Sequence, residues 1–337
     1  MDDHSIGPQL LFFQHIRNNL APHLSLVDEV ADLLNISIDS AYRRIRGEKS
    51  MDFEEIQKLS THFKISLDRL LHLNNSSDSF VFSGMLHQNS LEFFKHWLND
   101  VLAKATYISS FQKRHLYFNA KDMPFMSFYQ IPELVTFKSF VWMKTFLHLE
   151  ALRSKKISLK NNNPEYEELG AKINQVLNQI PTTELWNHVC LVATLSQIEF
   201  YAESNLFESK DDIAVVYDKL EELIRHYEKM AEAGKRFGIG EVPRSDLPEY
   251  NLFLNELFIG NNTWVAELNG NRIAILNHSV LHILVTNDER FSNYTFGEME
   301  NVIRKSTQIS TVGEKNRSKF FHGLYQNIDQ SKKKVLG

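Results

Sequence analysis

The segment that most constrains the fold is the run 27–49, because it holds two short helical patterns separated by only three residues. The first pattern has the spacing i, i+3, i+4, i+7 of one helix face, at Val27, Val30, Ala31 and Leu34. Asn35 tolerates the left-handed backbone of a sharp turn, and Ser37 is a good N-cap for a second helix that runs to about Arg46. Gly47 is suited to end that helix. The sequence therefore predicts two helices joined by a tight turn.

The residues on both sides of this pair carry further helix signals. In chain order these are the amphipathic run Leu10–Leu20, a capping box that starts at Ser25, a second one from Asp52 to Glu55, and an N-cap at Ser66. The inward faces of the last two helices are expected at Phe53, Ile56, Leu59, Phe63, Leu67, Leu70 and Leu71. We therefore predict a five-helix domain over 1–73, a polar linker at 74–80, and a larger domain over 81–337.

Charge is distributed unevenly along the first domain. The whole chain has a net charge of -5, and residues 1–72 hold eight basic against eleven acidic side chains. Residues 42–49 nevertheless hold four basic side chains and one acidic one. A protein that binds nucleic acid usually presents a basic face, and here the positive charge is concentrated on the second helix of the pair.

Several parts of this domain together carry a resemblance to a known family. They are Val30-Ala31, Asn35-Ile36-Ser37, the run 43–47, and FEEIQKLSTHFKISLDRLL at 53–71. Over residues 10–73 the chain resembles the helix-turn-helix domain of the Cro/C1 (XRE) family. The resemblance implies a bacterial transcription regulator with a lambda-repressor-like domain of five helices. It also implies binding to double-stranded DNA, commonly as a homodimer on a palindromic site, with the helix Ser37–Arg46 in the major groove.

The resemblance also implies individual DNA contacts. Those expected at base edges or nearby phosphates are Ser37, Asp39, Ser40 and Arg43, and those expected to hold the DNA backbone are Arg44, Arg46 and Lys49. Two positions depart from the family's pattern. Asn35 stands where the turn usually has glycine, and Ala41 stands where the helix usually has a branched aliphatic residue. We expect Tyr42 and Ile45 to complete the packing around Ala41, and the rotation of the helix depends on them.

The larger domain has mixed patterns and is expected to be α+β with a small antiparallel sheet, so that the whole chain is mainly α. Helices are expected over 86–105, 134–141, 169–180, 183–206 and 213–230, and strands over 106–111, 115–118, 250–259, 263–268 and 272–276. Asn269-Gly270-Asn271 is a strong hairpin turn, and 280–286 fits either a strand or a helix. Two helices are expected at the C-terminus, the second after a capping box at Thr311–Glu314.

Two features of this domain leave alternatives open. The heptad pattern over 213–230 fits a central core helix or a dimer seam, and we prefer the core helix. An aromatic segment offers a ligand pocket lined by Phe125, Phe128, Tyr129, Phe137, Phe140 and Trp142, although such residues more often form plain core.

Signals for enzymatic chemistry are weak. The sequence has no glycine-rich phosphate loop and no nucleophile elbow, and His278 and His282 could bind a metal only on a helix with a third ligand such as Asp288. The single cysteine, Cys190, is expected to be buried in a helix. We expect no enzyme, no cofactor, no metal and no membrane partner, and a cytoplasmic location because the N-terminus lacks a signal peptide pattern.

The leading hypothesis is a sequence-specific DNA-binding transcription regulator, whose second domain senses a small-molecule or protein effector or forms oligomers. The alternative is a helix-turn-helix bundle that has become a protein-interaction module and does not bind DNA, which the acidic balance of residues 1–72 permits.

Overall fold

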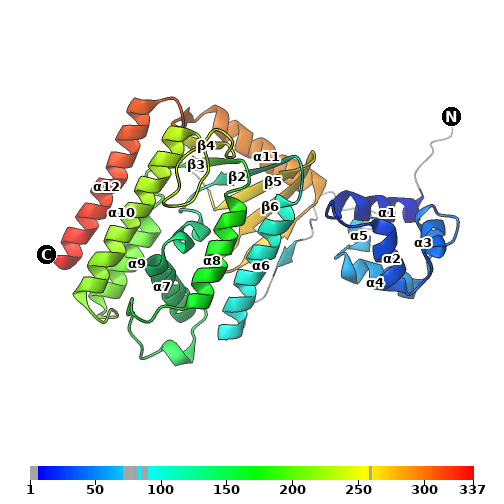
Figure 1. Ribbon diagram of the computed structural model, residues 1–337, viewed down its shortest axis with the longest axis horizontal. Helices are drawn as coiled ribbons and strands as arrows, with labels where there is room; N and C mark the ends of the chain where they lie inside the picture. Colours follow the sequence, from blue (N-terminus) through cyan, green and yellow to red (C-terminus); the bar gives the residue numbers. More distant parts are fainter. Residues whose placement is uncertain (1–6, 71–79, 81, 85–89, 258–259) are drawn as a thin grey trace. The chain divides into compact units, whose positions relative to one another are not determined.

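The chain divides into two compact units, Met1–Val81 and Phe82–Gly337, in a computed structural model that describes residues 7–70, 80, 82–84, 90–257 and 260–337 (Figure 1). The linker predicted at 74–80 lies outside the described residues except for Phe80. Among the described residues, the structure holds no helix whose length and hydropathy suit a membrane span.

The first unit contains five helices within residues 7–70. They are α1 (Pro8–Asn19), α2 (Leu26–Leu34), α3 (Ile38–Ile45), α4 (Phe53–His62) and α5 (Leu67–Leu70). Their buried apolar side chains form one core, made by Phe12, Phe13, Ile16, Leu26, Val30, Ala31, Leu34, Ala41, Ile45, Leu59 and Leu70. Each helix is too short to be stable alone in water, so this shared core holds the helices together.

Three of the predicted N-caps are confirmed, although the one at Ser25 forms without a complete capping box. Ser25 and Ser37 accept hydrogen bonds from the backbone of α2 and α3, and Asp52 and Glu55 form a complete capping box at the start of α4. Asn35 has a φ of 51°, so the turn between α2 and α3 is left-handed as predicted. These are short-range interactions, which is why the sequence alone could predict them.

Two inward assignments in the first unit are wrong. Phe53 is 87% exposed, because it is the first residue of α4 and Leu59 is the residue of that helix that enters the core. Tyr42 is 43% exposed, whereas Ala41 and Ile45 are buried as expected. Leu71, also expected to face inward, lies outside the described residues.

The second unit is built on a mixed sheet of eight described strands. They are β1 (Ser83–Gly84), β2 (Arg114–Asn119), β3 (Thr182–Trp186), β4 (Tyr250–Leu254), β5 (Thr263–Leu268), β6 (Asn271–Asn277), β7 (Ile283–Thr286) and β8 (Thr307–Gln308). Their order is β1-β7-β6-β5-β2-β3-β4-β8. Strands β2, β3 and β4 are parallel neighbours and the other five pairings are antiparallel, so the predicted antiparallel sheet is confirmed in part and the sheet is larger and mixed.

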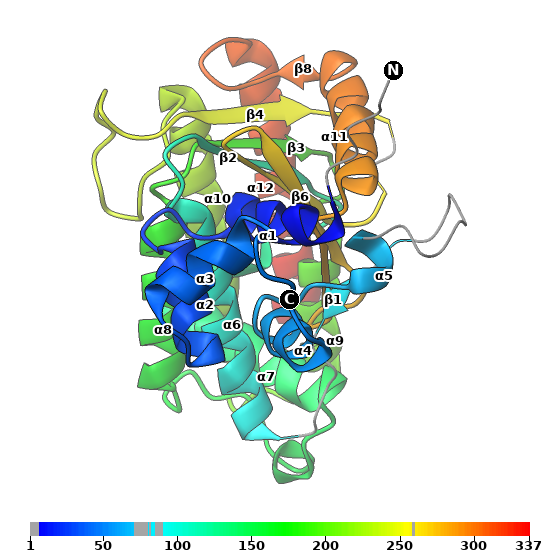
Figure 2. The same ribbon diagram turned by 90° about the vertical axis from the view of Figure 1, so that its right-hand side faces the viewer.

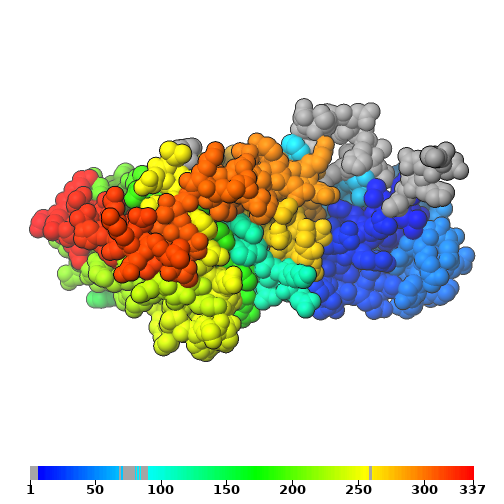
Figure 3. Space-filling view, turned by 90° about the horizontal axis from the view of Figure 1, so that it is seen from above, coloured from blue at the N-terminus to red at the C-terminus, as the bar shows by residue number. Residues whose placement is uncertain are grey.

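Helices fill the connections between the parallel strands, as parallel pairing requires. The main helices of this unit are α6 (Leu91–Ser109), α7 (Pro132–Val141), α8 (Pro164–Leu177), α9 (Val192–Glu203), α10 (Lys210–Ala233), α11 (Glu289–Arg304) and α12 (Glu314–Leu336). Three short 3-10 or π segments, η1 (Phe125–Gln130), η2 (Trp142–Phe146) and η3 (Glu150–Leu152), lie around α7. In the space-filling view, the segment from α11 to α12, orange to red, runs along the surface of this unit (Figure 3).

Side chains alternate between the two faces of the sheet. Phe118 and Trp186 face the large helical core, whereas Leu185 and Val265 face α11 through Phe296. Figure 2 shows α11 on one side of the sheet and α8 and α10 on the other. The sheet is therefore covered on both faces, which is typical of parallel strands.

Several predicted elements of the second unit need correction. The strand predicted at 106–111 belongs to α6, the helix predicted at 183–206 is β3 followed by α9, and the described part of the helix predicted at 86–105 begins at Leu91. The cap of α12 is Gly313, with no side-chain hydrogen bond, so the capping box from Thr311 does not form. The hairpin at Asn269-Gly270 is confirmed, and the ambiguous run 280–286 contains strand β7.

The heptad pattern belongs to α10, whose predicted apolar positions are all buried inside the second unit. They are Ile213, Val216, Leu220, Leu223, Tyr227 and Met230. Helix α10 packs against α12, α7 and β4. Because these side chains are already covered within one chain, the preferred interpretation of a core helix is confirmed.

Candidate nucleic-acid interface

Helix α3 has one face in the core and one face in solvent. Ala41, Arg44 and Ile45 are buried. The residues on the opposite side are exposed, namely Ser37, Ile38, Asp39, Tyr42, Arg43 and Arg46. Lys49, which follows the helix, is exposed as well. Most of the predicted DNA-contacting residues therefore lie on one accessible surface.

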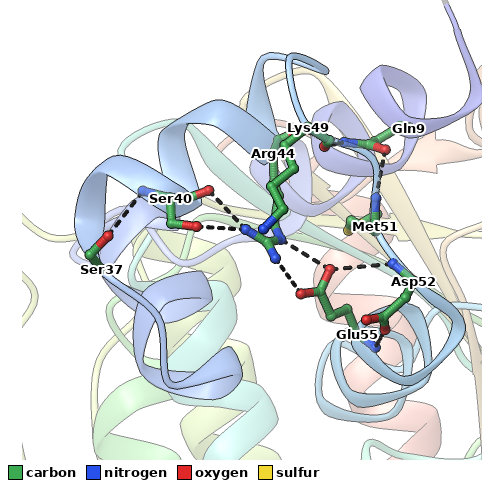
Figure 4. A network of polar contacts seen from close by, with 8 residues as sticks. All are labelled: Gln9, Ser37, Ser40, Arg44, Lys49, Met51, Asp52 and Glu55. Atoms are coloured by element: carbon green, nitrogen blue, oxygen red, sulfur yellow. Dashed lines mark hydrogen bonds and ion pairs between the residues drawn. The ribbon is translucent and has the colours of Figure 1, made fainter.

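Arg44 is the exception, and its assignment to the DNA backbone is corrected. Its side chain is only 5% exposed and forms two parallel bonds to Glu55, Nε to Oε2 at 3.0 Å and Nη2 to Oε1 at 2.5 Å. Its Nη1 donates to the hydroxyl of Ser40 at 2.7 Å (Figure 4). All three guanidinium nitrogens thus bond within the domain, so Arg44 positions α3 against α4. Ser40, a predicted base contact, is half-buried and shares in this contact.

The charges of this ion pair stabilise each other. The hydrogen bonds from Arg44 hold the pKa of the Glu55 carboxyl below its ordinary value, although partial burial opposes this. The same contacts raise the pKa of Arg44. An arginine that donates two parallel hydrogen bonds to one carboxylate is held strongly and in one orientation. The pair therefore sets the rotation of α3 about its axis.

Helix α1 holds the C-terminal end of α3 and the segment that follows it. The side-chain amide of Gln9 donates to the carbonyls of Arg44 and Lys49, both at 2.7 Å, and its oxygen accepts from the backbone of Met51 at 3.2 Å. Glu55 also accepts from the backbone of Asp52 at 3.3 Å as part of its capping box. A connected network therefore ties α1, α3 and α4 together behind the exposed face of α3 (Figure 4).

The exposed face of α3 carries two rows of side chains. Ile38, Tyr42 and Arg46 follow each other at four-residue spacing, and Asp39 and Arg43 form the second row. The guanidinium carbon of Arg46 lies 5.4 Å from the centre of the Tyr42 ring, within the range of a cation–π contact. Sequence reasoning missed Ile38 and Tyr42 as surface residues. The helical phase set by Ala41 and Ile45 was the signal that could have placed them there.

The charge of this surface differs from the count along the sequence, because Glu55 neutralises Arg44. Arg43, Arg46 and Lys49 remain as exposed cations, and Arg46 lies 3.4 Å from Glu48 in an exposed pair. The neighbouring helix α2 carries acidic side chains at Asp28, Glu29 and Asp32. The basic surface is therefore small and bordered by acidic groups.

The aromatic residues proposed as a pocket lie in the core of the second unit. Phe128, Tyr129, Phe137 and Trp142 are buried, and Phe125 and Phe140 are partly buried against the same core. The rings contact each other, for example Tyr129 stacked on Trp142 at 5.8 Å between ring centres. This packing assigns the segment to the core, the more common of the two readings.

The remaining candidates for chemistry do not come together. His278 and His282 flank the turn between β6 and β7 rather than one helix face, with ring centres 6.1 Å apart. Within the described part of the chain, no group of three or more His, Cys, Asp or Glu side chains could hold a metal ion. Cys190 is buried as expected but lies in the turn before α9, and burial raises the pKa of its thiol.

The sequence did not reveal a buried polar cluster around β3. Glu184 is fully buried and accepts from the Trp186 indole at 2.8 Å and the Tyr250 hydroxyl at 3.0 Å. Arg236 lies 3.7 Å away and donates to Thr182. Sequence patterns predict that a glutamate in a short strand faces solvent, and for this reason they could not identify Glu184 as buried.

Comparison with known families gives one match. Residues 14–106 match the model of the BetR domain, a domain associated with regulators of the helix-turn-helix type. The match begins within α1 and ends within α6, and it covers less than a third of the chain. No curated protein and no solved structure matches the chain. The match fits a regulator with a helix-turn-helix-like domain, and the resemblance to the Cro/C1 family stays a prediction.

Proposed function

We propose that the chain is a sequence-specific DNA-binding transcription regulator that inserts the exposed face of α3 into the major groove. The observation that carries the proposal is that two adjacent arginines have different environments, one buried in an ion pair and one exposed. Arg44 pairs with Glu55 and fixes the helix, whereas the adjacent Arg43 is exposed to solvent. A helix held from behind by an ion pair, with polar and basic side chains in front, is suited to enter a groove.

The exposed side chains have different proposed roles. Arg43 lies in the middle of the face and matches the paired acceptors of guanine, while Asp39 can accept from cytosine. We assign Arg46 and Lys49, at the end of α3 and beyond it, to contacts with phosphates, which carry no sequence information. The second unit supplies sensing of an effector or oligomerisation, and the first unit docks as a dimer on a palindromic site.

Selection of bound duplexes from a random pool, with the full chain, tests this function. We expect an enriched sequence whose affinity falls with salt, with a log–log slope of about 0.9 per phosphate contacted. Arg43→Ala should relax the base preference at one position, and Lys49→Ala should weaken all sequences alike. Arg17→Ala, which removes an exposed arginine of α1, is the matched control and should leave the preference unchanged. A failure to bind any duplex above the nonspecific level at low salt would overturn the proposal.

The acidic side chains of α2 favour a second candidate, a protein-docking module. In a helix-turn-helix the first helix crosses the DNA backbone, where Asp28 and Asp32 would repel phosphates. Asp32→Asn separates the two candidates. If DNA is the partner, the loss of one repulsion should raise affinity for every duplex at low salt. An unchanged affinity, together with no enriched sequence, favours a protein partner.

A further inference from the structure

Two large apolar side chains lie on the exposed face of α3. Ile38 is 46% exposed and Tyr42 is 43% exposed, and they are one helical turn apart. Ile38 does not contribute to the core of the first unit. As a β-branched residue it is also a weaker helix former than most long side chains. Neither packing nor helix propensity therefore accounts for an isoleucine at the first position of this helix.

The side of α3 away from Ile38 and Tyr42 is engaged in contacts within the domain. Ser40 lies there, and its hydroxyl and carbonyl both accept hydrogen bonds from Arg44. The flank that carries Ile38 and Tyr42 faces solvent, and Arg46 lies over the Tyr42 ring. In a groove, this flank would place apolar surface beside the polar row of Asp39 and Arg43.

The major groove offers one apolar feature, the C5-methyl group of thymine. The N-terminal residues of a recognition helix are the ones that reach base edges, and Ile38 is the first residue of α3. Resting on the proposed function, we propose that Ile38 and Tyr42 contact thymine methyl groups, so that the target half-site carries thymines beside the base pair that Arg43 reads.

The spacing of the two side chains sharpens this proposal. Four residues along a helix span about 6 Å, at about 1.5 Å per residue. Base pairs along a strand are about 3.4 Å apart, so the two methyl groups belong to base pairs about two steps apart. The half-site therefore contains two thymines at this separation, on either strand.

Replacement of thymine by deoxyuridine tests the contact, because it removes the methyl group and leaves the hydrogen-bonding groups unchanged. With the duplex selected for the full chain, we expect affinity to fall about fourfold for each methyl group contacted, from the burial free energy of one such group. Substitution of thymines elsewhere in the duplex should have no effect. Ile38→Ala should abolish the fall at one thymine, and Tyr42→Ala at the other.

Leu24→Ala is the matched control, since Leu24 is 41% exposed in the same unit and lies outside α3. This variant should keep the full difference in affinity between the thymine and deoxyuridine duplexes. If a sequence is selected and every deoxyuridine duplex binds as well as its parent, the methyl contact is wrong and DNA binding stands. If Ile38→Ala and Tyr42→Ala both still bind the thymine duplex more tightly than the deoxyuridine duplex, other residues contact the methyl groups and the inference is also overturned. If no duplex is selected, both proposals fall.

Discussion

Among the described residues, each unit has an arginine–glutamate pair that is largely shielded from solvent, and the two pairs differ in geometry. In the first unit, Arg44 meets both oxygens of Glu55, at 2.5 and 3.0 Å. In the second unit, the nearest atoms of Arg236 and Glu184 are 3.7 Å apart, and Glu184 accepts instead from two aromatic side chains. The Glu55 side chain is 16% exposed, whereas Glu184 has no exposure.

Because of these differences, the pKa values of the two carboxyl groups shift in opposite directions. Contact with Arg44 lowers the pKa of Glu55. Burial raises the pKa of Glu184, although Arg236 and two hydrogen bonds oppose it. Within the described residues, Oε1 of Glu184 has no hydrogen-bond partner. The same two residue types therefore form a stable ion pair at the edge of one core and a costly charge inside the other.

The largest expected effect comes from Arg236→Ala, which would leave Glu184 in the core without a nearby cation. Loss of one partner of a buried pair costs about 3 to 5 kcal/mol. Tryptophan fluorescence in denaturant can measure this, because Trp97, Trp142, Trp186 and Trp264 are the only tryptophans and all lie in the second unit. Arg153→Ala is the control, because the Arg153 side chain is 80% exposed, and it should cost under about 0.5 kcal/mol. A similar small cost for Arg236→Ala would show that Glu184 is neutral in the folded chain.

Arg44→Ala should have the next largest effect, in the first unit. Glu55 is left partly hydrated, so the cost is about 2 to 3 kcal/mol. Hydrogen exchange of α3 and α4 amides should speed up, while the tryptophan transition of the second unit stays the same. Arg43→Ala is a control one residue away and should leave exchange unchanged but lose base preference. Equal exchange in the two variants would mean that the pair with Glu55 does not hold α3.

The contrast between Arg43 and Arg44 marks the limit of what the sequence could predict here. Caps and turns depend on neighbours within a few residues, so Ser37, Asn35 and the box at Asp52 were predictable. Which arginine faces inward depends on Glu55, eleven residues further along the chain. A run of basic residues alone contains no information about that distant partner.

The sheet shows the same limit at a larger scale. The hairpin β5–β6 was predicted from a local turn, whereas the parallel core of β2, β3 and β4 was not. Strand β3 is buried along its whole length and is too short for a clear period. Its partners on the two sides come from distant segments of the chain. The β5–β6 hairpin was therefore visible in the sequence, and the parallel part of the sheet was not.

The two pairs should respond to pH with opposite signs. Glu55 has a lowered pKa, so its contribution is present above its ordinary value of 4.5 and is lost as the pH falls through the folded value. Glu184 has a raised pKa, so its contribution is present below 4.5 and is lost as the pH rises through the folded value. Each unit of difference between folded and unfolded pKa corresponds to about 1.4 kcal/mol.

Glutamine substitutions test these signs, since glutamine keeps the shape and removes the titration. Wild type should lose stability in the second unit as the pH rises from 4 to 7, and Glu184→Gln should remove this loss in tryptophan fluorescence. Glu55→Gln should destabilise the first unit at pH 7 in hydrogen exchange. If the stability of the two units changed with pH in the same direction between pH 4 and pH 7, the opposite pKa shifts of Glu55 and Glu184 would be contradicted.

The smallest effect is expected from Gln9→Ala, which loosens the end of α3 without touching the ion pair. Its side chain makes three hydrogen bonds, but they lie at or near the surface and water can replace them, so the loss is about 1 kcal/mol. The residues after α3, including Lys49, should then become less ordered, while Arg44 still fixes the rotation of the helix. We therefore expect DNA affinity to fall a few-fold with the base preference retained, in contrast to Arg43→Ala. Exposed Gln14→Ala, on the same helix, is the control and should change neither. A changed base preference in Gln9→Ala would mean that the loop, and not the pair with Glu55, sets which side chains of α3 face the bases.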